Sequence, residues 1–357
     1  MLRVLVVDDS HFTQSQVASY LEEAGHEVVG KARNGKQAIS MVEEHEPDVV
    51  TMDVKMPGMG GIEAVERIMA TRPTPVVMLS RYTEEGAETT VEALEAGAVD
   101  YFHKPGEEPS LDLYEYKAEL IDTVEDAAKV QPEPLAPAAD TDDEEASESV
   151  STSATASVTA ADGNPLVIIA SSTGGPRLLK QHLGPLPRDA GFRVIVVQHL
   201  RDQFTGQFAR DLDTVSEYTV RESIDGGTVA PGEMVVAYGG SHLAVTDDDG
   251  ETLTVEHVET DRDVNVQPAA DVTMASAAEN AEGPVIGVVL TGLGTDGTAG
   301  VEAIKTAGGR TIAQDDESSP AHWMPSSARE SGYVDHVTTA ADLVGTILDA
   351  TRPEAEP

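Results

Sequence analysis

Short apolar runs alternate with amphipathic patterns along the first 130 residues. The apolar runs are continuous in Val, Ile and Leu, which is typical of strands buried on both faces of a parallel sheet. Between them, apolar residues recur at the three-to-four spacing of helices that cover such a sheet. The predicted strands are Leu2–Val7, Val28–Ala32, Val49–Asp53, Pro75–Ser80 and Val99–His103. The predicted helices are Ser10–Ala24, Lys36–His45, Ile62–Ala70, Glu84–Ala96 and, approximately, Leu111–Val130.

The second half of the chain repeats this pattern over a longer segment. It predicts a larger, doubly wound and mainly parallel α/β domain. A polar insertion over Tyr218–Glu259 is interpreted as β-hairpins, one of them turning at Asp248, Asp249 and Gly250. The strands predicted for the parallel sheet are Leu166–Ala170, Arg193–Gln198, Val285–Leu290, Thr311–Gln314 and Tyr333–His336.

A biased segment separates the two patterns. Residues 131–163 contain eight acids, no Lys or Arg and no aromatic residue. Such a composition buries too little apolar surface to offset the entropy of ordering, which indicates a disordered acidic tether. The predicted organisation is therefore a domain over 1–130, a linker over 131–163 and a second domain over 164–352.

The charge balance restricts the function and the environment. The 357 residues include 64 acidic and 23 basic ones, for a net charge of −41. This charge disfavours binding to nucleic acid or to an anionic membrane surface, and it is typical of a halophile's protein. The chain has no cysteine, which excludes thiolate chemistry. Without an apolar run of about 18 residues or a signal-peptide pattern, we expect a cytoplasmic protein with no membrane insertion.

Polar residues follow the predicted strands of the first domain. Asp8 and Asp9, Asp53, Ser80 and Lys104 stand at strand ends, and these ends meet at one edge of a parallel sheet. Three converging carboxylates suit a hard cation such as Mg²⁺, and a carboxylate beside a hydroxyl and an ammonium suits phosphoryl transfer. The alternative for each Asp is a helix cap.

The strand ends of the second domain carry Ser172, His199 and Asp296. A serine nucleophile needs a histidine base, and the base needs a carboxylate to orient it. We therefore expect Ser172 as nucleophile, His199 as general base and then acid, and Asp296 as the orienting carboxylate. Ser172 is preferred to Ser171 because it is followed at two residues by glycine, as in a nucleophile elbow; Ser171 is then a packing residue.

Each of these residues also has a structural alternative. A serine after a strand caps helices, a strand-end histidine is often only hydrogen-bonded, and Asp-Gly is common in turns. A glycine-rich turn entering a helix could also cradle phosphate, but the Walker lysine is missing. His242 and His322 compete with His199 for the role of base.

The first domain resembles the receiver domain of two-component response regulators over about residues 1–124. The resemblance implies a flavodoxin-like (βα)₅ fold that is phosphorylated on Asp53 by a histidine kinase. It also implies that Tyr101 is the aromatic residue whose rotamer reports the switch. The ligands implied for Mg²⁺ are Asp8, Asp9, Asp53 and the Lys55 carbonyl, and the residues implied to contact the phosphoryl group are Ser80 and Lys104.

Together, the two domains resemble the chemotaxis protein-glutamate methylesterase (CheB) family. The motifs are Ser172-Thr173-Gly174-Gly175, Val197-Gln198-His199 and Leu290–Gly297. The resemblance implies hydrolysis of γ-glutamyl methyl esters on chemoreceptors, which releases methanol, and deamidation of receptor glutamines. Both reactions would pass through an acyl-enzyme on Ser172, without a cofactor in this domain. The oxyanion donors implied are the amides of Thr173, Gly174 and Gly175 and the backbone of Leu293.

Several positions depart from the family pattern. Ala170-Ser171 replaces Gly-Ala, Arg201 replaces a proline, Gln267-Pro268-Ala269 replaces Arg-Pro-Ser, and Trp323 replaces a glycine.

The two domains also suggest regulation: the unphosphorylated receiver docks over the Ser172 edge, and phosphorylated Asp53 favours undocking. Two other functions remain open, a non-catalytic adaptor that binds receptor arrays and a hydrolase of small-molecule esters.

Overall fold

The N-terminal half folds around a parallel sheet in the order β2-β1-β3-β4-β5. The computed structural model describes residues 1–81, 84–104, 113–132, 163–260 and 266–351. The strands are β1 (Arg3–Val7), β2 (Glu27–Ala32), β3 (Val49–Asp53), β4 (Val76–Arg81) and β5 (Asp100–Lys104). The helices are α1 (His11–Glu23), α2 (Gly35–His45), α3 (Gly61–Thr71), α4 (Glu84–Glu95) and α5 (Leu113–Ala127).

Alternating side chains of each strand bury two cores, as the first strand illustrates. Val4 and Val6 pack with residues of α1 and α5, whereas Leu5 and Val7 pack with residues of α2, α3 and α4. The continuous apolar runs therefore mark strands with helices on both faces. The predicted (βα)₅ arrangement is confirmed for this half.

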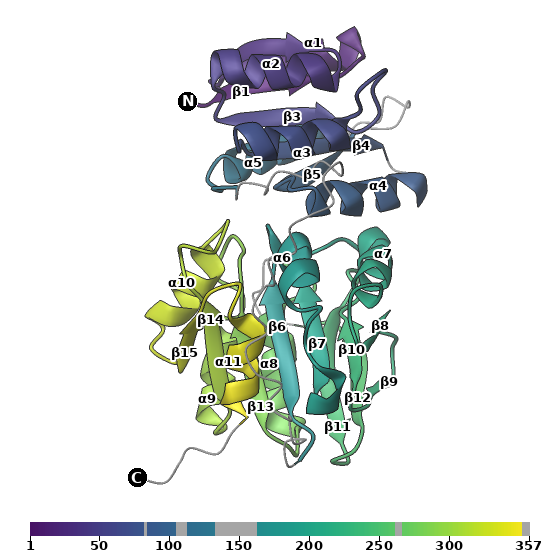
Figure 1. The fold of residues 1–357 in the computed structure, drawn as a ribbon, viewed down its shortest axis with the longest axis vertical. Coiled ribbons are helices and arrows are strands. Elements are labelled where there is room, and N and C mark those ends of the chain that lie inside the picture. Colours follow the sequence, from purple (N-terminus) through teal and green to yellow (C-terminus); the bar gives the residue numbers. More distant parts are fainter. Residues whose placement is uncertain (82–83, 105–112, 133–162, 261–265, 352–357) are drawn as a thin grey trace, which may run out of the picture.

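The C-terminal half forms a second parallel sheet, in the order β15-β14-β13-β6-β7-β10-β8 (Figure 1). Its strands are β6 (Leu166–Ser171), β7 (Arg193–Gln198), β8 (Thr219–Glu222), β10 (Glu233–Val236), β13 (Val285–Val289), β14 (Arg310–Gln314) and β15 (His336–Thr338). A smaller antiparallel sheet contains β9 (Gly227–Val229), β11 (His242–Asp248) and β12 (Leu253–Val258). The helices are α6 (Gly175–His182), α7 (Asp202–Asp213), α8 (Ala270–Asn280), α9 (Thr298–Thr306), α10 (Trp323–Glu330) and α11 (Leu343–Ala350), and Arg188–Ala190 forms a 3₁₀ turn.

Two strand predictions for this half were wrong. The insertion over Tyr218–Glu259 is a hairpin only at β11 and β12, because β8 and β10 join the main sheet parallel to β7. Short strands reveal neither their partner nor their direction from composition. The last strand lies at His336–Thr338 and not at Tyr333–His336, because Tyr333 and Val334 pack on the core as a loop.

Helices cover both faces of the second sheet, and the order in which the chain adds strands reverses direction at β6. Helices α6, α7 and α11 share a core on one face, whereas α8, α9, α10 and the β11–β12 hairpin share a core on the other. The chain leaves β6 toward β7 on one side and later returns with β13 on the other. Ligands of open α/β sheets bind at the carboxyl end of the strands at such a switch point.

The two halves contact each other through α4, β5 and α5 of the first and α6 and α7 of the second (Figure 1). Lys180 on α6 forms an ion pair with Glu95 on α4 at 2.5 Å. The ring of Tyr101 packs edge-on against Phe204 of α7, with centroids 4.6 Å apart. Arg201 pairs with Glu119 of α5.

Two further sequence predictions concern the tether and membrane insertion. The predicted tether lies outside the described residues except for positions 131, 132 and 163. Among the helices that the structure describes, none is long and apolar enough to cross a membrane.

Candidate active site

Three neighbouring strands deliver the predicted triad to one edge of the second sheet. Ser172 follows β6 directly, His199 follows β7 directly, and Asp296 lies in the loop between β13 and α9. Since β13, β6 and β7 are adjacent and parallel, their carboxyl ends lie side by side. Backbone bonds from Ser172 N–H to the Thr291 carbonyl and from His199 N–H to the Ser171 carbonyl, each 2.9 Å, tie the three loops together.

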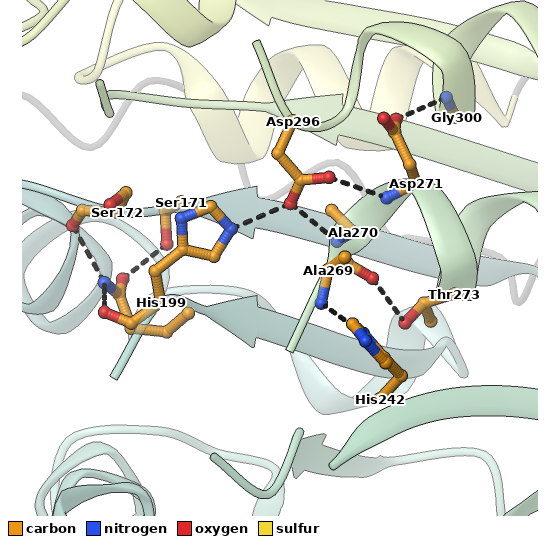
Figure 2. Close-up of polar contacts among 11 residues, drawn as sticks. Ser171, Ser172, His199, His242, Ala269, Ala270, Asp271, Thr273, Asp296 and Gly300 are labelled. Atoms are coloured by element: carbon orange, nitrogen blue, oxygen red, sulfur yellow. Dashed lines mark hydrogen bonds and ion pairs between the residues drawn. The ribbon is translucent and has the colours of Figure 1, made fainter. Parts of the chain in front are cut away.

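The imidazole of His199 lies between Ser172 and Asp296 (Figure 2). Its Nε2 is 2.7 Å from Asp296 Oδ2, and both side chains are mostly buried. A carboxylate only accepts hydrogen bonds, so Nε2 carries the proton in the neutral ring and Nδ1 keeps its lone pair on the serine side. No hydrogen bond joins Ser172 Oγ to the His199 ring, and both residues lie within the described ranges; such contacts often tighten only when substrate binds.

Two backbone groups of α8 hold the Asp296 carboxylate. Oδ2 accepts the N–H of Ala270 at 2.7 Å, and Oδ1 accepts the N–H of Asp271 at 3.0 Å (Figure 2). Burial would raise the pKa of Asp296, but the hydrogen bond and charge of His199 and these two N–H groups hold it below its usual value. The carboxylate is therefore ionised and directed at His199.

The turn after Ser172 requires glycine at two positions. Gly174 has φ +79°, a left-handed conformation that glycine adopts without a steric penalty. Gly175 begins α6, and a Cβ there would stand 2.1 Å from Gln198 Oε1 and 2.8 Å from Ser171 Oγ. The turn therefore brings the helix N-terminus close against the end of β7.

Gln198 organises this turn, and sequence reasoning missed its role. Its Oε1 accepts the hydroxyl of Ser171 at 2.6 Å, and its Nε2 donates to the Ser172 carbonyl at 2.8 Å. The clue was a polar side chain directly after four apolar residues of the strand. Ser171 is fully buried and engaged with Gln198, in agreement with its interpretation as a packing residue.

The four backbone amides expected to stabilise an oxyanion differ in whether they already form a hydrogen bond. The N–H of Gly175 donates to the Ser172 carbonyl at 2.9 Å, so the expectation for this amide was wrong. Within the described ranges, the N–H groups of Thr173, Gly174 and Leu293 form no hydrogen bond. These three amides are available to a ligand.

The competing histidines make contacts of a different kind. Nδ1 of His242 accepts the N–H of Ala269, the N-cap residue of α8, at 3.2 Å, and burial lowers the pKa of His242. His322 stacks on Trp323 with ring centroids 4.4 Å apart. Neither forms a hydrogen bond with Ser172 among the described residues.

The N-terminal half carries the predicted acidic cluster. Ligand oxygens of Asp8, Asp9 and Asp53 lie within 4.8 Å of one another at the carboxyl ends of β1 and β3. Three hard oxygen donors this close fit a divalent cation such as Mg²⁺. The backbone places Ser80 in β4 and Lys104 at the end of β5, but their side chains lie outside the described residues.

A cavity of about 480 Å³ separates the candidate triad from the N-terminal half. Ser172, His199 and Leu293 line it from one side, and Asp100 and Tyr101 line it from the other. Burial raises the pKa of Asp100 to about 6. The N-terminal half therefore covers the edge that carries Ser172 without filling the space above it.

The fold and the site thus define a receiver joined to an α/β domain with Ser, His and Asp at its switch point. Residues 167–347 match the family model described as CheB methylesterase, and residues 4–113 match the response regulator receiver domain. The chain belongs to the CheB methylesterase family, as the sequence motifs predicted.

The curated relatives match the chain over nearly its whole length. Three of them are called protein-glutamate methylesterase/protein-glutamine glutaminase. The one from Haloarcula marismortui is 42% identical over 99% of this chain and 98% of its own. That from Halobacterium salinarum is 43% identical over 99% of both chains, and that from Thermotoga maritima is 39% identical over 98% of both. The predicted family of enzymes is confirmed, and two of these organisms are halophiles, as the charge suggested.

Proposed function

We propose that the chain is a phosphorylation-regulated serine hydrolase that acts in the cytoplasm on chemoreceptors. It removes methyl esters from receptor glutamyl residues and deamidates specific receptor glutamines. The observation that supports this most directly is the arrangement of Ser172, His199 and Asp296 at three adjacent strand ends. The names of the relatives support the two reactions.

The first half of the reaction forms an acyl-enzyme. Nδ1 of His199 takes the proton of Ser172, and Oγ attacks the carbonyl carbon of the side-chain ester. The developing oxyanion is received by the available amides of Thr173, Gly174 and Leu293. The imidazolium then protonates the leaving methoxide, and methanol departs.

The second half restores the enzyme. Water gives a proton to His199 and attacks the acyl carbon, and collapse of the intermediate returns the proton to Ser172 Oγ and releases the glutamate carboxylate. For a glutamine side chain, the leaving group is ammonia. One oxyanion site serves both substrates because ester and amide pass through the same kind of tetrahedral intermediate.

In the receiver half, Asp53 would accept the phosphoryl group from a chemotaxis histidine kinase. Asp8, Asp9, Asp53 and the Lys55 carbonyl would hold Mg²⁺, which neutralises phosphoryl oxygens when bound. Ser80 and Lys104 would contact the phosphoryl group.

Docking of the receiver supplies the regulation. A receptor helix with its side chains is about 10 Å across, so the α4–β5–α5 surface above Ser172 would exclude it. Tyr101, the aromatic residue expected to report the switch, packs against Phe204 of α7, so a change of its rotamer would alter this interface. Phosphorylation favours undocking only through different affinities for the two states.

Phosphorylation is expected to increase methanol release from methyl-labelled receptor membranes by at least about tenfold, which corresponds to a shift of about 1.4 kcal/mol in docking. The assay compares the full chain in molar KCl with and without a small phosphoryl donor. Lys180→Glu, which opposes Glu95, should raise the unphosphorylated rate. Arg67→Glu is the control, because among the described residues Arg67 pairs only with Glu63 of its own helix. If neither phosphorylation nor Lys180→Glu changes the rate of methanol release, regulation by docking is refuted.

A small phosphonate that labels active serines is expected to modify Ser172 at similar rates with and without phosphorylation. The cavity over the triad admits a molecule of this size even when the receiver is docked. Mass spectrometry of the labelled peptide gives the rate. Protection of Ser172 in the unphosphorylated chain would instead show that docking disables the triad itself.

The same membrane assay distinguishes a non-catalytic adaptor from the proposed receptor hydrolase. An adaptor would bind receptor membranes and release no methanol in any phosphorylation state. A small-molecule esterase would hydrolyse free methyl esters faster than receptor esters.

A further inference from the structure

Two helix N-termini meet beside Asp296, and neither is capped by the side chain of its own N-cap residue. The N-cap residue of α8 is Ala269, and that of α9 is Gly297. The first N–H groups of a helix have no acceptor within the helix. Acceptors for both ends therefore come from outside the helix, from other parts of the chain or from water.

The two ends exchange their acceptors. Asp296, which immediately precedes the N-cap of α9, accepts the N–H groups of Ala270 and Asp271 in the first turn of α8. In return, Oδ1 of Asp271 accepts the N–H of Gly300 in the first turn of α9 at 2.7 Å (Figure 2). Asp296, which lies just before α9, thus caps α8, and Asp271, in the first turn of α8, caps α9.

We infer that Asp271 is a positioning residue for the hydrolytic reaction, because its hold on the first turn of α9 fixes the orientation in which Asp296 meets His199. The inference rests on the proposed function, since it assigns Asp271 to the chemistry of Ser172. If the two helix ends separate, the loop that carries Asp296 moves with α9, whereas the N–H donors to its carboxylate stay with α8. The 2.7 Å contact with Nε2 is then lost or tilted.

Charge adds to this geometric role. Burial, and then the charge of Asp296, raise the pKa of Asp271 to about 6, although N–H groups of α9 and its N-cap oppose the rise. The other titratable groups around the pair are His199 beyond Asp296 and His242, which approaches from β11. An ionised Asp271 makes the potential at His199 more negative and so favours the imidazolium that forms when Ser172 is deprotonated.

Two substitutions separate geometry from charge. Both leave the backbone N–H of residue 271 in place for Asp296. For Asp271→Ala, we expect kcat to fall about 10- to 100-fold with KM unchanged, because Asp296 loses its alignment. Asp271→Asn keeps an acceptor for Gly300 N–H and should recover most of kcat. Its acid limb in the pH–rate profile should move to lower pH, because the negative charge is gone.

The kinetics are measured on receptor membranes in molar KCl with the receiver phosphorylated, so that docking does not contribute. Asp213→Ala is the control: this carboxylate at the end of α7 also accepts a backbone N–H, from Val220 at 2.8 Å, at the opposite end of the strands. The inference is wrong if Asp271→Ala lowers kcat no more than the control, or if Asp271→Asn keeps the wild-type pH profile. If the alanine variant does not fold, the profile of the asparagine variant decides.

A spectroscopic measurement keeps the inference separate from the proposed function. In a Ser172→Ala background, the proton between His199 Nε2 and Asp296 should give a downfield NMR resonance, and Asp271→Ala should shift or remove it. An unchanged resonance overturns the positioning role. Full esterase activity of Ser172→Ala alone would instead refute the proposed nucleophile while leaving this resonance informative.

Discussion

Ser172→Ala is expected to reduce methanol release from methyl-labelled receptor membranes by roughly 10⁴- to 10⁶-fold. Without Oγ no acyl-enzyme forms, and His199 and the three available amides support only slow attack by water. The substitution removes one atom at a partly exposed position, so the free energy of unfolding should change little. The assay uses the full chain in molar KCl with its receiver phosphorylated.

Ser171→Ala is the matched comparison, because Ser171 is the adjacent serine and its hydroxyl is engaged with Gln198. Its loss of activity should be far smaller and should come from a looser turn. Equal activity of Ser172→Ala and wild type would move the nucleophile elsewhere. A large loss confined to Ser171→Ala would identify Ser171 as the nucleophile.

Asp296→Asn is expected to lower kcat about 10²- to 10⁴-fold. Within the described residues, every hydrogen-bond partner of this carboxylate is an N–H donor: Nε2 of His199 and the backbone N–H groups of Ala270 and Asp271. An amide has one acceptor oxygen, so in either orientation its NH₂ group faces a donor. If the NH₂ group faces His199, the ring adopts the other tautomer and Nδ1 can no longer accept the proton of Ser172.

The pH–rate profile distinguishes this effect from a general loss of structure. Since the pKa of Asp296 lies below its usual value, the carboxylate is ionised throughout the neutral range and the wild-type acid limb reports other groups. Asp213→Asn, at the opposite end of the strands, serves as the control and should retain kcat. A wild-type kcat for Asp296→Asn would show that this carboxylate does not orient the base.

The sequence was most informative where apolar pattern and motif agreed. Continuous Val and Ile runs predicted the five strands of the first sheet within one residue or two at each end. It was least informative for β8 and β10, which have four residues each: β10 pairs in parallel with β7, and β8 pairs in parallel with β10. Pairing between distant segments depends on packing, so the local pattern does not contain it.

The site shows the same division. The motifs predicted Ser172, His199 and Asp296, because each belongs to a recognisable strand-end sequence. The roles of Gln198 and Asp271 and the engagement of the Gly175 amide were missed, since each depends on a hydrogen bond to a group made available by the local fold. The tautomer of His199 was likewise open until Nε2 was found to face Asp296.

The sequence by itself therefore determined the α/β class of both halves, the family and the residue types at the strand ends, because these follow from hydrophobic periodicity and local motifs. Only the tertiary structure decided which strands are neighbours, which amides remain available and how the receiver covers the Ser172 edge. These properties depend on contacts such as Asp271 with Gly300 and Lys180 with Glu95, whose partners lie far apart in the chain and meet only when both sheets have packed.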